Sequence, residues 1–279
     1  MSPQDDAGTA GFLDVQSTDG TPIRVWIRGE GPPIVLVHGS LRDHSIFEPL
    51  IAQLQSTLTT YAIDRRGFGS SGDRDGYAIE QEFRDVAAVV DAIAARKGPV
   101  ALLGHSYGAG CAMGGAALTR NASHLILYEP SLGIAYPAGW IEANFKALEA
   151  GDADSVIRAV LVDILEMTNE DVEARRSTPR WADYLRAAPT VLREARTENG
   201  WEYQPGAFDG VLASTLVLVG TETAPPLMQS TLRAAAAIPG ARTHVLGGHG
   251  HLACATDPDL IASIITQFVG RSRPDRPAG

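Results

Sequence analysis

One short segment in the first half of the chain restricts the folds that this sequence can adopt. It reads Gly104-His105-Ser106-Tyr107-Gly108, directly follows an apolar run at 99–103, and precedes small residues at 109–118. The apolar run predicts a strand and the small residues predict a helix, so the segment is a tight turn between them. Glycine on both sides of the serine removes Cβ atoms that would collide in such a turn. The pattern is typical of a nucleophile elbow, which exposes the Ser106 hydroxyl at the carboxyl end of a strand.

Strand-like and helix-like segments alternate along much of the chain. An alternating hairpin at 12–16 and 23–27 is followed by a continuous apolar run at 34–37. Further strands are expected at 59–63, 100–103, 125–128, 214–219 and 243–246, with helices at 79–96, 227–237 and 258–269. Alternation of this kind predicts an α/β fold with a mostly parallel central sheet and helices on both faces.

The alternation of strand-like and helix-like segments stops in the middle of the chain. Residues 131–205 contain no strand-like run and show only helical periodicity. We therefore predict a helical cap or lid at 131–205, inserted into a core formed by residues 1–130 and 206–279.

Composition and charge exclude several classes of function. The net charge of -10 argues against binding to nucleic acid or to an anionic membrane surface. Residues 1–11 lack the pattern of a secretory signal, and no apolar run approaches the roughly 18 residues that span a membrane. Cys111 and Cys254 form neither a disulfide framework nor a metal-ligand cluster. We expect a cytoplasmic protein without a metal or organic cofactor, and the sequence leaves a homodimer open.

An elbow serine needs a base and an orienting acid, because its hydroxyl is a poor nucleophile alone. The base is expected in the loop after the last strand, where Gly248-His249-Gly250-His251 assigns it to His251 and leaves His249 as a polar neighbour. Two carboxylates compete for the acid. Glu129 follows the strand at 125–128 and Glu222 follows the strand at 214–219, so both would stand at the carboxyl edge of the sheet.

Acyl transfer also needs an oxyanion hole, formed by two backbone N–H groups. One is expected from Tyr107, the residue after the nucleophile. The other is expected from the loop after the strand at 34–37, where Ser40 is the first candidate and Gly39 and Leu41 are alternatives.

Four segments together resemble the α/β-hydrolase superfamily: His38-Gly39, residues 64–72, residues 104–108 and residues 248–251. The resemblance implies the α/β-hydrolase fold over nearly the whole chain, and it implies a structural role for Asp64 and Arg66. Serine at position 106 separates the chain from the haloalkane dehalogenases and epoxide hydrolases, whose nucleophile is aspartate.

The resemblance also bears on the acid. Thr223 stands where the superfamily commonly has an aspartate, which favours Glu129 over Glu222. Tyr128-Glu129-Pro130 and Pro179-Arg180-Trp181-Ala182 are similar to segments of the zearalenone lactonases, in which the tryptophan faces the substrate.

These features predict a serine hydrolase that cleaves a carboxylic ester or lactone through an acyl-enzyme. The aromatic and aliphatic side chains of the lid suggest a substrate with an apolar group, contacted by Trp140, Trp181 and Tyr184. The alternative keeps the fold without net hydrolysis, because the superfamily also contains perhydrolases, acyl transferases and ligand receptors.

Overall fold

Strands from both halves of the chain form one sheet in the computed structural model, which describes residues 11–165 and 167–270. Within these residues the sheet has eight strands in the order β1-β2-β4-β3-β5-β6-β7-β8. Their bounds are β1 Gly11–Gln16, β2 Pro22–Arg28, β3 Pro33–Val37, β4 Thr59–Ile63, β5 Val100–His105, β6 Ala122–Tyr128, β7 Ser214–Gly220 and β8 Arg242–Leu246.

The sheet is mostly parallel, as predicted. Strand β2 pairs antiparallel with β1 and with β4, and the remaining neighbours pair parallel. Parallel strands end at the same edge of a sheet. The residues that directly follow β3, β5, β6, β7 and β8 are therefore gathered at one edge.

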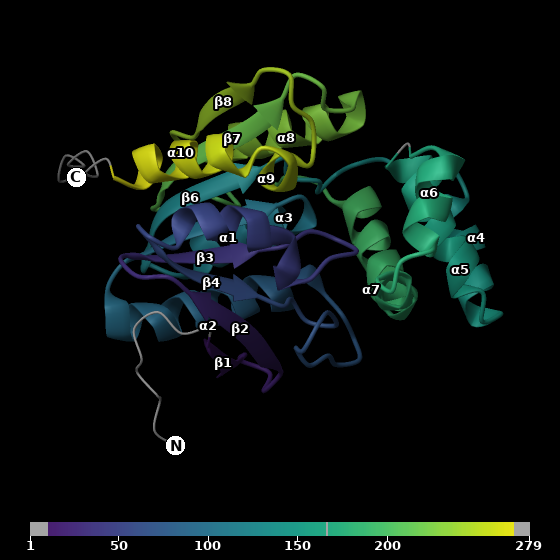
Figure 1. The fold of residues 1–279 in the computed structure, drawn as a ribbon, viewed down its shortest axis with the longest axis horizontal. Coiled ribbons are helices and arrows are strands. Elements are labelled where there is room, and N and C mark those ends of the chain that lie inside the picture. The colour runs from purple at the N-terminus through teal and green to yellow at the C-terminus, as the bar shows by residue number, and fades with distance from the viewer. Residues whose placement is uncertain (1–10, 166, 271–279) are drawn as a thin grey trace.

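Helices cover both faces of the sheet (Figure 1). One face is covered by α2 Ile79–Lys97, α3 Tyr107–Leu118 and α8 Pro225–Ala237. The other is covered by α1 Glu48–Leu54, α9 Ala253–Thr256 and α10 Pro258–Val269. The sequence did not predict α1, α9 or the 3-10 turn η1 His44–Phe47, because such short elements carry too few periodic positions to stand out.

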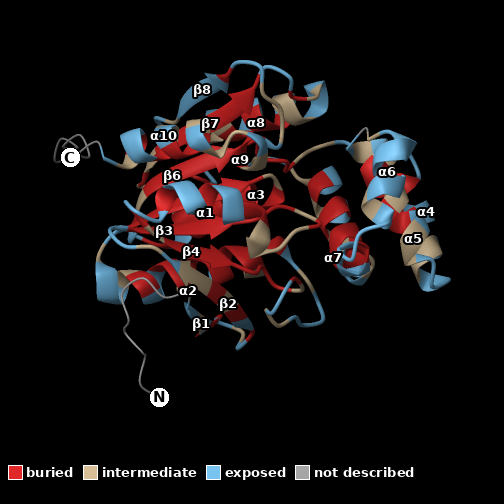
Figure 2. Ribbon diagram, in the orientation of Figure 1, coloured by how far each residue is buried: buried red, intermediate tan, exposed pale blue. Residues whose placement is uncertain are grey.

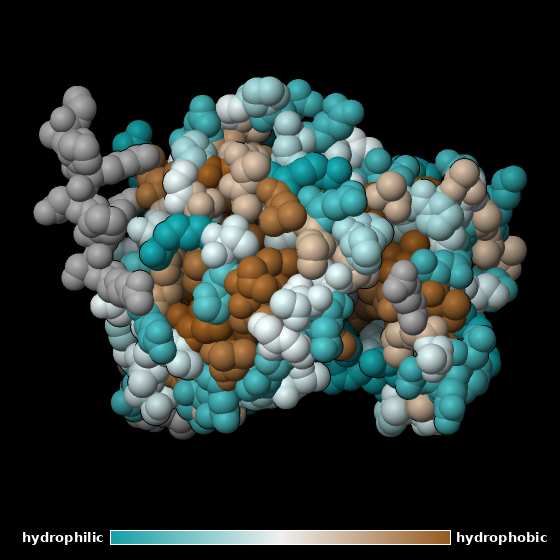
Figure 3. Space-filling view, turned by 90° about the horizontal axis from the view of Figure 1, so that it is seen from above, coloured by the Kyte–Doolittle hydropathy of each residue, from teal (hydrophilic) through white to brown (hydrophobic). Residues whose placement is uncertain are grey.

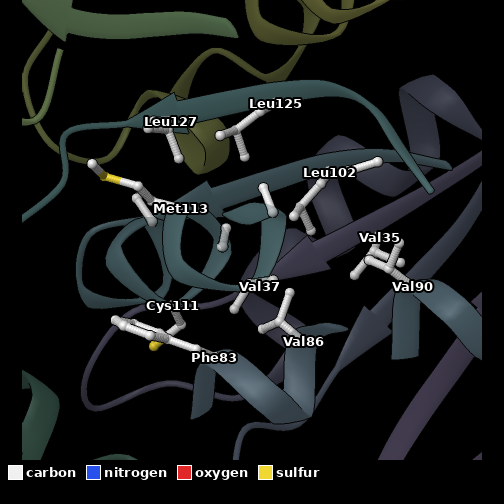
Figure 4. Close-up of a cluster of buried hydrophobic side chains, with 14 of the residues drawn as sticks. Val35, Val37, Phe83, Val86, Val90, Leu102, Cys111, Met113, Leu125 and Leu127 are labelled. Carbon is white, nitrogen blue, oxygen red and sulfur yellow. The ribbon is translucent and has the colours of Figure 1, made fainter. Parts of the chain in front are cut away.

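The buried residues lie along the strands and on the inward faces of the helices (Figure 2). Successive side chains of β3 point to opposite faces of the sheet. Val35 and Val37 pack with α2 and α3, as the close-up of that cluster shows (Figure 4), whereas Ile34 and Leu36 pack on the opposite side. This double burial explains why β3 reads as a continuous apolar run.

A group of helices lies between β6 and β7 in the chain, as the helical periodicity predicted. We call it the helical insertion. It consists of α4 Trp140–Glu149, α5 Ala153–Ala159, the π-helical turn η2 Val160–Ile164, α6 Asn169–Arg176 and α7 Trp181–Gly200. The hydrophobic cluster of the insertion also includes Leu41 and Phe68 from loops of the core. The insertion stands beyond one end of the sheet (Figure 1) and is set off from the core by an indentation of the surface (Figure 3). Its action as a lid, and the domain boundaries at 131 and 205, stay predictions.

No helix in the described ranges is long and apolar enough to cross a membrane. The absence of a secretory signal was predicted from residues 1–11. Of these, only Gly11 lies within the described residues.

Candidate active site

Ser106 occupies a backbone conformation that non-glycine residues rarely adopt. Its φ is 58° and its ψ is -128°, at the junction of β5 and α3. A Cβ on Gly104 would lie 2.5 Å from the Ala109 Cα, and a Cβ on Gly108 would lie 2.2 Å from the His38 carbonyl oxygen. Both glycines are therefore required by close packing, and the turn has the geometry of a nucleophile elbow.

The sheet register places Glu129 beside this turn. His105 pairs with Tyr128 across the parallel strands β5 and β6, and these are the last residues of the two strands. Ser106 and Glu129 directly follow them and therefore lie side by side. The Ser106 N–H donates to the Tyr128 carbonyl at 2.9 Å, and the Glu129 N–H donates to the Leu218 carbonyl at 3.1 Å. Glu129 also has a positive φ, 47°, which turns the chain at the end of β6.

His251 and Glu129 are joined by a hydrogen bond. Nδ1–H of His251 donates to Oε2 of Glu129 at 2.7 Å, and the carboxylate is fully buried. The other oxygen, Oε1, accepts from the Gly220 N–H at 2.9 Å and from the Thr223 hydroxyl. Thr223, which stands where an aspartate is common, thus supports the carboxylate of Glu129. With Nδ1 donating, a neutral His251 has its acceptor at Nε2.

His105 holds the backbone of His251. Its Nε2–H donates to the His251 carbonyl at 2.8 Å, and the two ring centroids are 4.4 Å apart. Burial, followed by the charge of His251, holds the pKa of His105 well below its usual range, so this ring is neutral. The residue inside the elbow therefore positions the loop that carries His251.

The structure places the competing candidates differently. Glu222 is exposed; its backbone N–H donates to the His249 carbonyl at 2.9 Å, and its carboxylate forms no hydrogen bond with any described residue. His249 Nε2 lies 3.4 Å from an Asp257 carboxylate oxygen. The structure thus brings Glu129, not Glu222, to His251.

The expected oxyanion loop lies against the nucleophile. A Cβ on Gly39 would come within 2.7 Å of the Ser106 Cβ and 3.3 Å of its Oγ. Leu41 has a φ of 60°, so the chain turns sharply just after Ser40. The Ser40 N–H donates no hydrogen bond within the described part of the chain. Tyr107 is the first residue of α3, where the N–H has no acceptor inside the helix.

His38 fixes the conformation of this loop through hydrogen bonds to Arg65 and Gly39. Its Nε2 accepts from the Arg65 N–H at 3.0 Å, so the proton is on Nδ1, which donates to the Gly39 carbonyl at 2.7 Å. Burial lowers the pKa of His38 to about 3, which keeps the ring neutral.

Sequence reasoning missed a fully buried ion-pair cluster around Arg65. Its guanidinium donates to Glu82 of α2 at 2.8 Å and to Glu194 of α7 at 2.6 Å, and it also reaches the His38 carbonyl at 2.8 Å. Arginine is rarely buried unless it is paired with an acidic residue. The acidic partners of Arg65 are distant in the sequence, so no local pattern indicated that it is buried.

Asp64 and Arg66, for which the resemblance implied a structural role, both tie loops together. Asp64 accepts from the His44 backbone N–H at 3.0 Å and from the Ser70 N–H at 2.9 Å. Arg66 forms two 2.6 Å hydrogen bonds with Asp85. None of these contacts involves Ser106 or His251.

The three aromatic residues expected at the substrate divide into two groups. Trp140 and Trp181 are 8% and 7% exposed and pack inside the helical insertion, where their Nε1–H groups donate to Asp163 and Asp154 at 2.8 and 3.0 Å. Tyr184 is 3% exposed and belongs to the same cluster, but it also lines an open cavity of about 640 Å³. A direct contact between the two tryptophans and the substrate stays a prediction.

This cavity is lined by charged as well as apolar groups. It lies between the loop after β3 and the turn from α6 to α7, and we call it the arginine-lined cavity. Its lining residues are Arg42, Arg175, Thr178, Pro179, Arg180, Asp183 and Tyr184. The sequence did not reveal it, because its arginines come from separate segments.

The described ranges contain no group of three or more His, Cys, Asp or Glu side chains placed to bind a metal ion. Cys111 and Cys254 are buried free thiols.

Comparison with known proteins identifies the family. Residues 34–264, most of the chain, match the alpha/beta hydrolase family. The chain belongs to the α/β hydrolase family. The resemblance seen in the sequence is thereby confirmed, and so is the α/β-hydrolase fold. An alpha/beta hydrolase from Sphaerobacter thermophilus superposes with a TM-score of 0.78 at 28% identity, over 92% of this chain and all of that one.

Two curated α/β hydrolase relatives differ in how much they share with this chain. A 2-(acetamidomethylene)succinate hydrolase of Mesorhizobium japonicum is 36% identical over 83 residues, which are 29% of this chain and 29% of that protein. A pimeloyl-(acyl-carrier protein) methyl ester esterase of Stenotrophomonas maltophilia is 25% identical over 89% of this chain and 96% of its own length.

Proposed function

We propose that this α/β hydrolase cleaves a carboxylic ester or lactone through an acyl-enzyme on Ser106. The observation that carries the proposal is the 2.7 Å hydrogen bond from His251 to the buried Glu129, at the sheet edge where the elbow presents Ser106. An orienting carboxylate, a base and a serine held by the backbone are the parts that nucleophilic acyl transfer needs.

The reaction follows from these positions. Nε2 of His251 takes the proton as the Ser106 oxygen attacks the substrate carbonyl, and Glu129 stabilises the resulting imidazolium. The N–H groups of Ser40 and Tyr107 bind the oxyanion. Collapse of the tetrahedral intermediate breaks the ester bond, and the leaving alkoxide takes the proton from His251. A water molecule, deprotonated by His251, then attacks the acyl-enzyme and releases the acid and the free serine.

An ester or lactone is favoured as the substrate class for two reasons. The relative that aligns along nearly its whole length is named as a methyl ester esterase. Opening a lactone and cleaving an ester break the same acyl–oxygen bond, so the same residues serve both. The apolar substrate group predicted from the lid side chains stays a prediction.

The test is the loss of hydrolysis in Ser106→Ala, measured with 4-nitrophenyl esters and simple lactones. We expect a fall in kcat of more than about 10³-fold, because removing the nucleophile of a triad disables it as a unit. Ser263→Ala is the matched control, since Ser263 is exposed on α10. Equal rates for Ser106→Ala and the wild type would overturn the proposed function.

A further inference from the structure

The arginine-lined cavity gathers three arginines and one aspartate, Asp183. In the described ranges, none of Arg42, Arg175 and Arg180 forms an ion pair with a carboxylate. The buried Arg65 and Arg66, by contrast, are each paired at 2.6 Å with an acidic side chain. Unpaired guanidinium groups facing one cavity are arranged for an external anion rather than for internal support.

Two acidic residues near the cavity are engaged elsewhere. Asp183, which lines the cavity, pairs with Arg186 one helical turn along α7. Asp43 follows Arg42 in the chain, but its carboxylate accepts from the backbone and hydroxyl of Ser45, at 2.9 and 2.5 Å, and caps the turn η1. The charge of Asp43 raises the pKa of Arg42, but neither carboxylate forms an ion pair with any of the three arginines.

The three arginines act on one another. Burial lowers the pKa of Arg42, and the charges of Arg175 and Arg180 lower it further, while Tyr184 acts in the opposite direction. The Arg42 guanidinium lies 5.8 Å from the centroid of the Tyr184 ring. Like charges held together in a partly buried place are costly, and a bound anion relieves that cost.

One residue of the cavity, Arg42, is close in the chain to the proposed oxyanion hole. Arg42 follows Ser40 by two residues, so their Cα atoms are at most about 7 Å apart. The charge of Arg42 also contributes, after burial and the charge of His251, to lowering the pKa of His105, which precedes Ser106. Ser40, Ser106 and His251 do not line the cavity, so the link between the cavity and the site is the short stretch of chain from Ser40 to Arg42.

We propose that the substrate of the proposed hydrolase is itself an anion, an ester or lactone that carries a carboxylate. This inference rests on the proposed function. The carboxylate is bound by Arg42, Arg175 and Arg180, whose planar guanidinium groups match the two oxygens of a carboxylate. The chain as a whole has a net charge of -10, so an anionic substrate gains no attraction from the overall charge and depends on this local cluster.

The test compares two esters of nearly identical shape. 4-Nitrophenyl hemisuccinate ends in a carboxylate, and 4-nitrophenyl 4-methylpentanoate replaces its two oxygens with methyl groups. The measured quantity is the ratio of kcat/KM for the charged ester to kcat/KM for the neutral one. We expect the wild type to prefer the charged ester by at least about tenfold, the effect of one charged hydrogen bond.

Two variants remove the positive charge, and one serves as a control. Arg42→Gln and Arg180→Gln should each lower the ratio about 10- to 100-fold. Arg176→Gln should leave the ratio unchanged, because Arg176 neighbours Arg175 on α6 but pairs with Asp154 at 3.1 Å. Arg180 is exposed, so its variant tests the inference even if Arg42→Gln folds poorly.

The outcomes separate this inference from the proposed function. If the wild type hydrolyses both esters and neither arginine variant changes the ratio, the hydrolase stands and the anionic substrate is refuted. If neither ester is hydrolysed, binding of monomethyl succinate to Ser106→Ala, measured by calorimetry, decides the matter. A Kd raised about tenfold by Arg42→Gln in that background supports the anion site. An unchanged Kd overturns it.

Discussion

Glu129 illustrates how one side chain is made into an orienting acid. Its carboxylate is fully buried, yet each oxygen has a partner: Gly220 and Thr223 donate to Oε1, and His251 donates to Oε2. A buried carboxylate is stable only when it is hydrogen-bonded in this way. The partners come from the end of β7 and from the loops after β7 and β8, so the sheet order β6-β7-β8 brings them together.

Replacing this carboxylate tests its role. Glu129→Gln keeps the shape and the acceptor for Gly220, but an amide cannot stabilise the imidazolium of His251. We expect kcat to fall by about 10⁴-fold, as for comparable triad acids. Glu222→Gln is the matched control and should keep kcat within roughly threefold, since surface substitutions rarely matter. A larger loss in Glu222→Gln than in Glu129→Gln would reverse the assignment of the acid.

At the scale of elements, α7 connects the helical insertion to the core. Glu198 near its end accepts hydrogen bonds from the Ser131 and Tyr136 hydroxyls, and its backbone carbonyl accepts from the Gly133 N–H at 3.1 Å. Burial raises the pKa of Glu198 from 4.5 to about 7, although the two hydroxyl donors oppose the change. The contact between α7 and the segment after β6 therefore includes a carboxyl group that titrates near neutral pH.

This titration predicts a pH-dependent stability. The pKa is raised in the folded state, so the folded protein binds the proton more tightly than the unfolded chain does. The stabilisation is complete below pH 4.5 and is lost as the pH rises through about 7. Over that range the loss is on the order of 3 kcal/mol.

The measurement is Tm between pH 5 and pH 8 for the wild type, Glu198→Gln and Glu202→Gln. The decrease in Tm should be smaller in Glu198→Gln, which cannot titrate. Glu202 is exposed, and its variant should follow the wild type. Equal decreases in all three proteins would show that Glu198 does not titrate in this range.

At the scale of the whole molecule, Arg65 joins the sheet, the helix layer that contains α2 and the helical insertion. It follows β4, bonds to Glu82 on α2, and reaches Glu194 on α7 of the helical insertion. Removing the cation would leave two buried carboxylates without compensation. We expect Arg65→Leu to lower the free energy of unfolding by about 3–5 kcal/mol, measured by urea denaturation.

An exposed ion pair provides the comparison. Arg28 lies 3.9 Å from Glu48 at the surface, so Arg28→Leu should cost less than about 1 kcal/mol. A similar loss in the two variants would mean that the Arg65 cluster does not hold the layers together.

The sequence predicted the sheet and the elbow because their signals are local. Continuous apolar runs such as 34–37 identify central strands, and the glycines around Ser106 identify the turn. The acid was harder, since Glu129 and Glu222 both follow strands. The resemblance favoured Glu129, but the contact that distinguishes the two is made by the loop carrying His251, whose position depends on tertiary structure.

The arginine-lined cavity and the Arg65 cluster could not be predicted for the same reason. An arginine in a sequence is ordinarily read as exposed, and burial and pairing are properties of the folded chain. Arg42 lies in the loop after β3 and Arg175 on α6, so no local pattern connects them. The apolar substrate group expected from the lid composition stays a prediction, because Trp140 and Trp181 pack inside the insertion.

The most direct test of the catalytic assignment is intact-mass analysis after exposure to a fluorophosphonate probe, which labels activated serines. We predict one adduct on the wild type, mapped to the peptide that contains Ser106, and no adduct on Ser106→Ala. Labelling should be slower in Glu129→Gln, because His251 is then less able to deprotonate the serine. An unlabelled wild type, or equal labelling of Ser106→Ala, would contradict the assignment of Ser106 as the nucleophile.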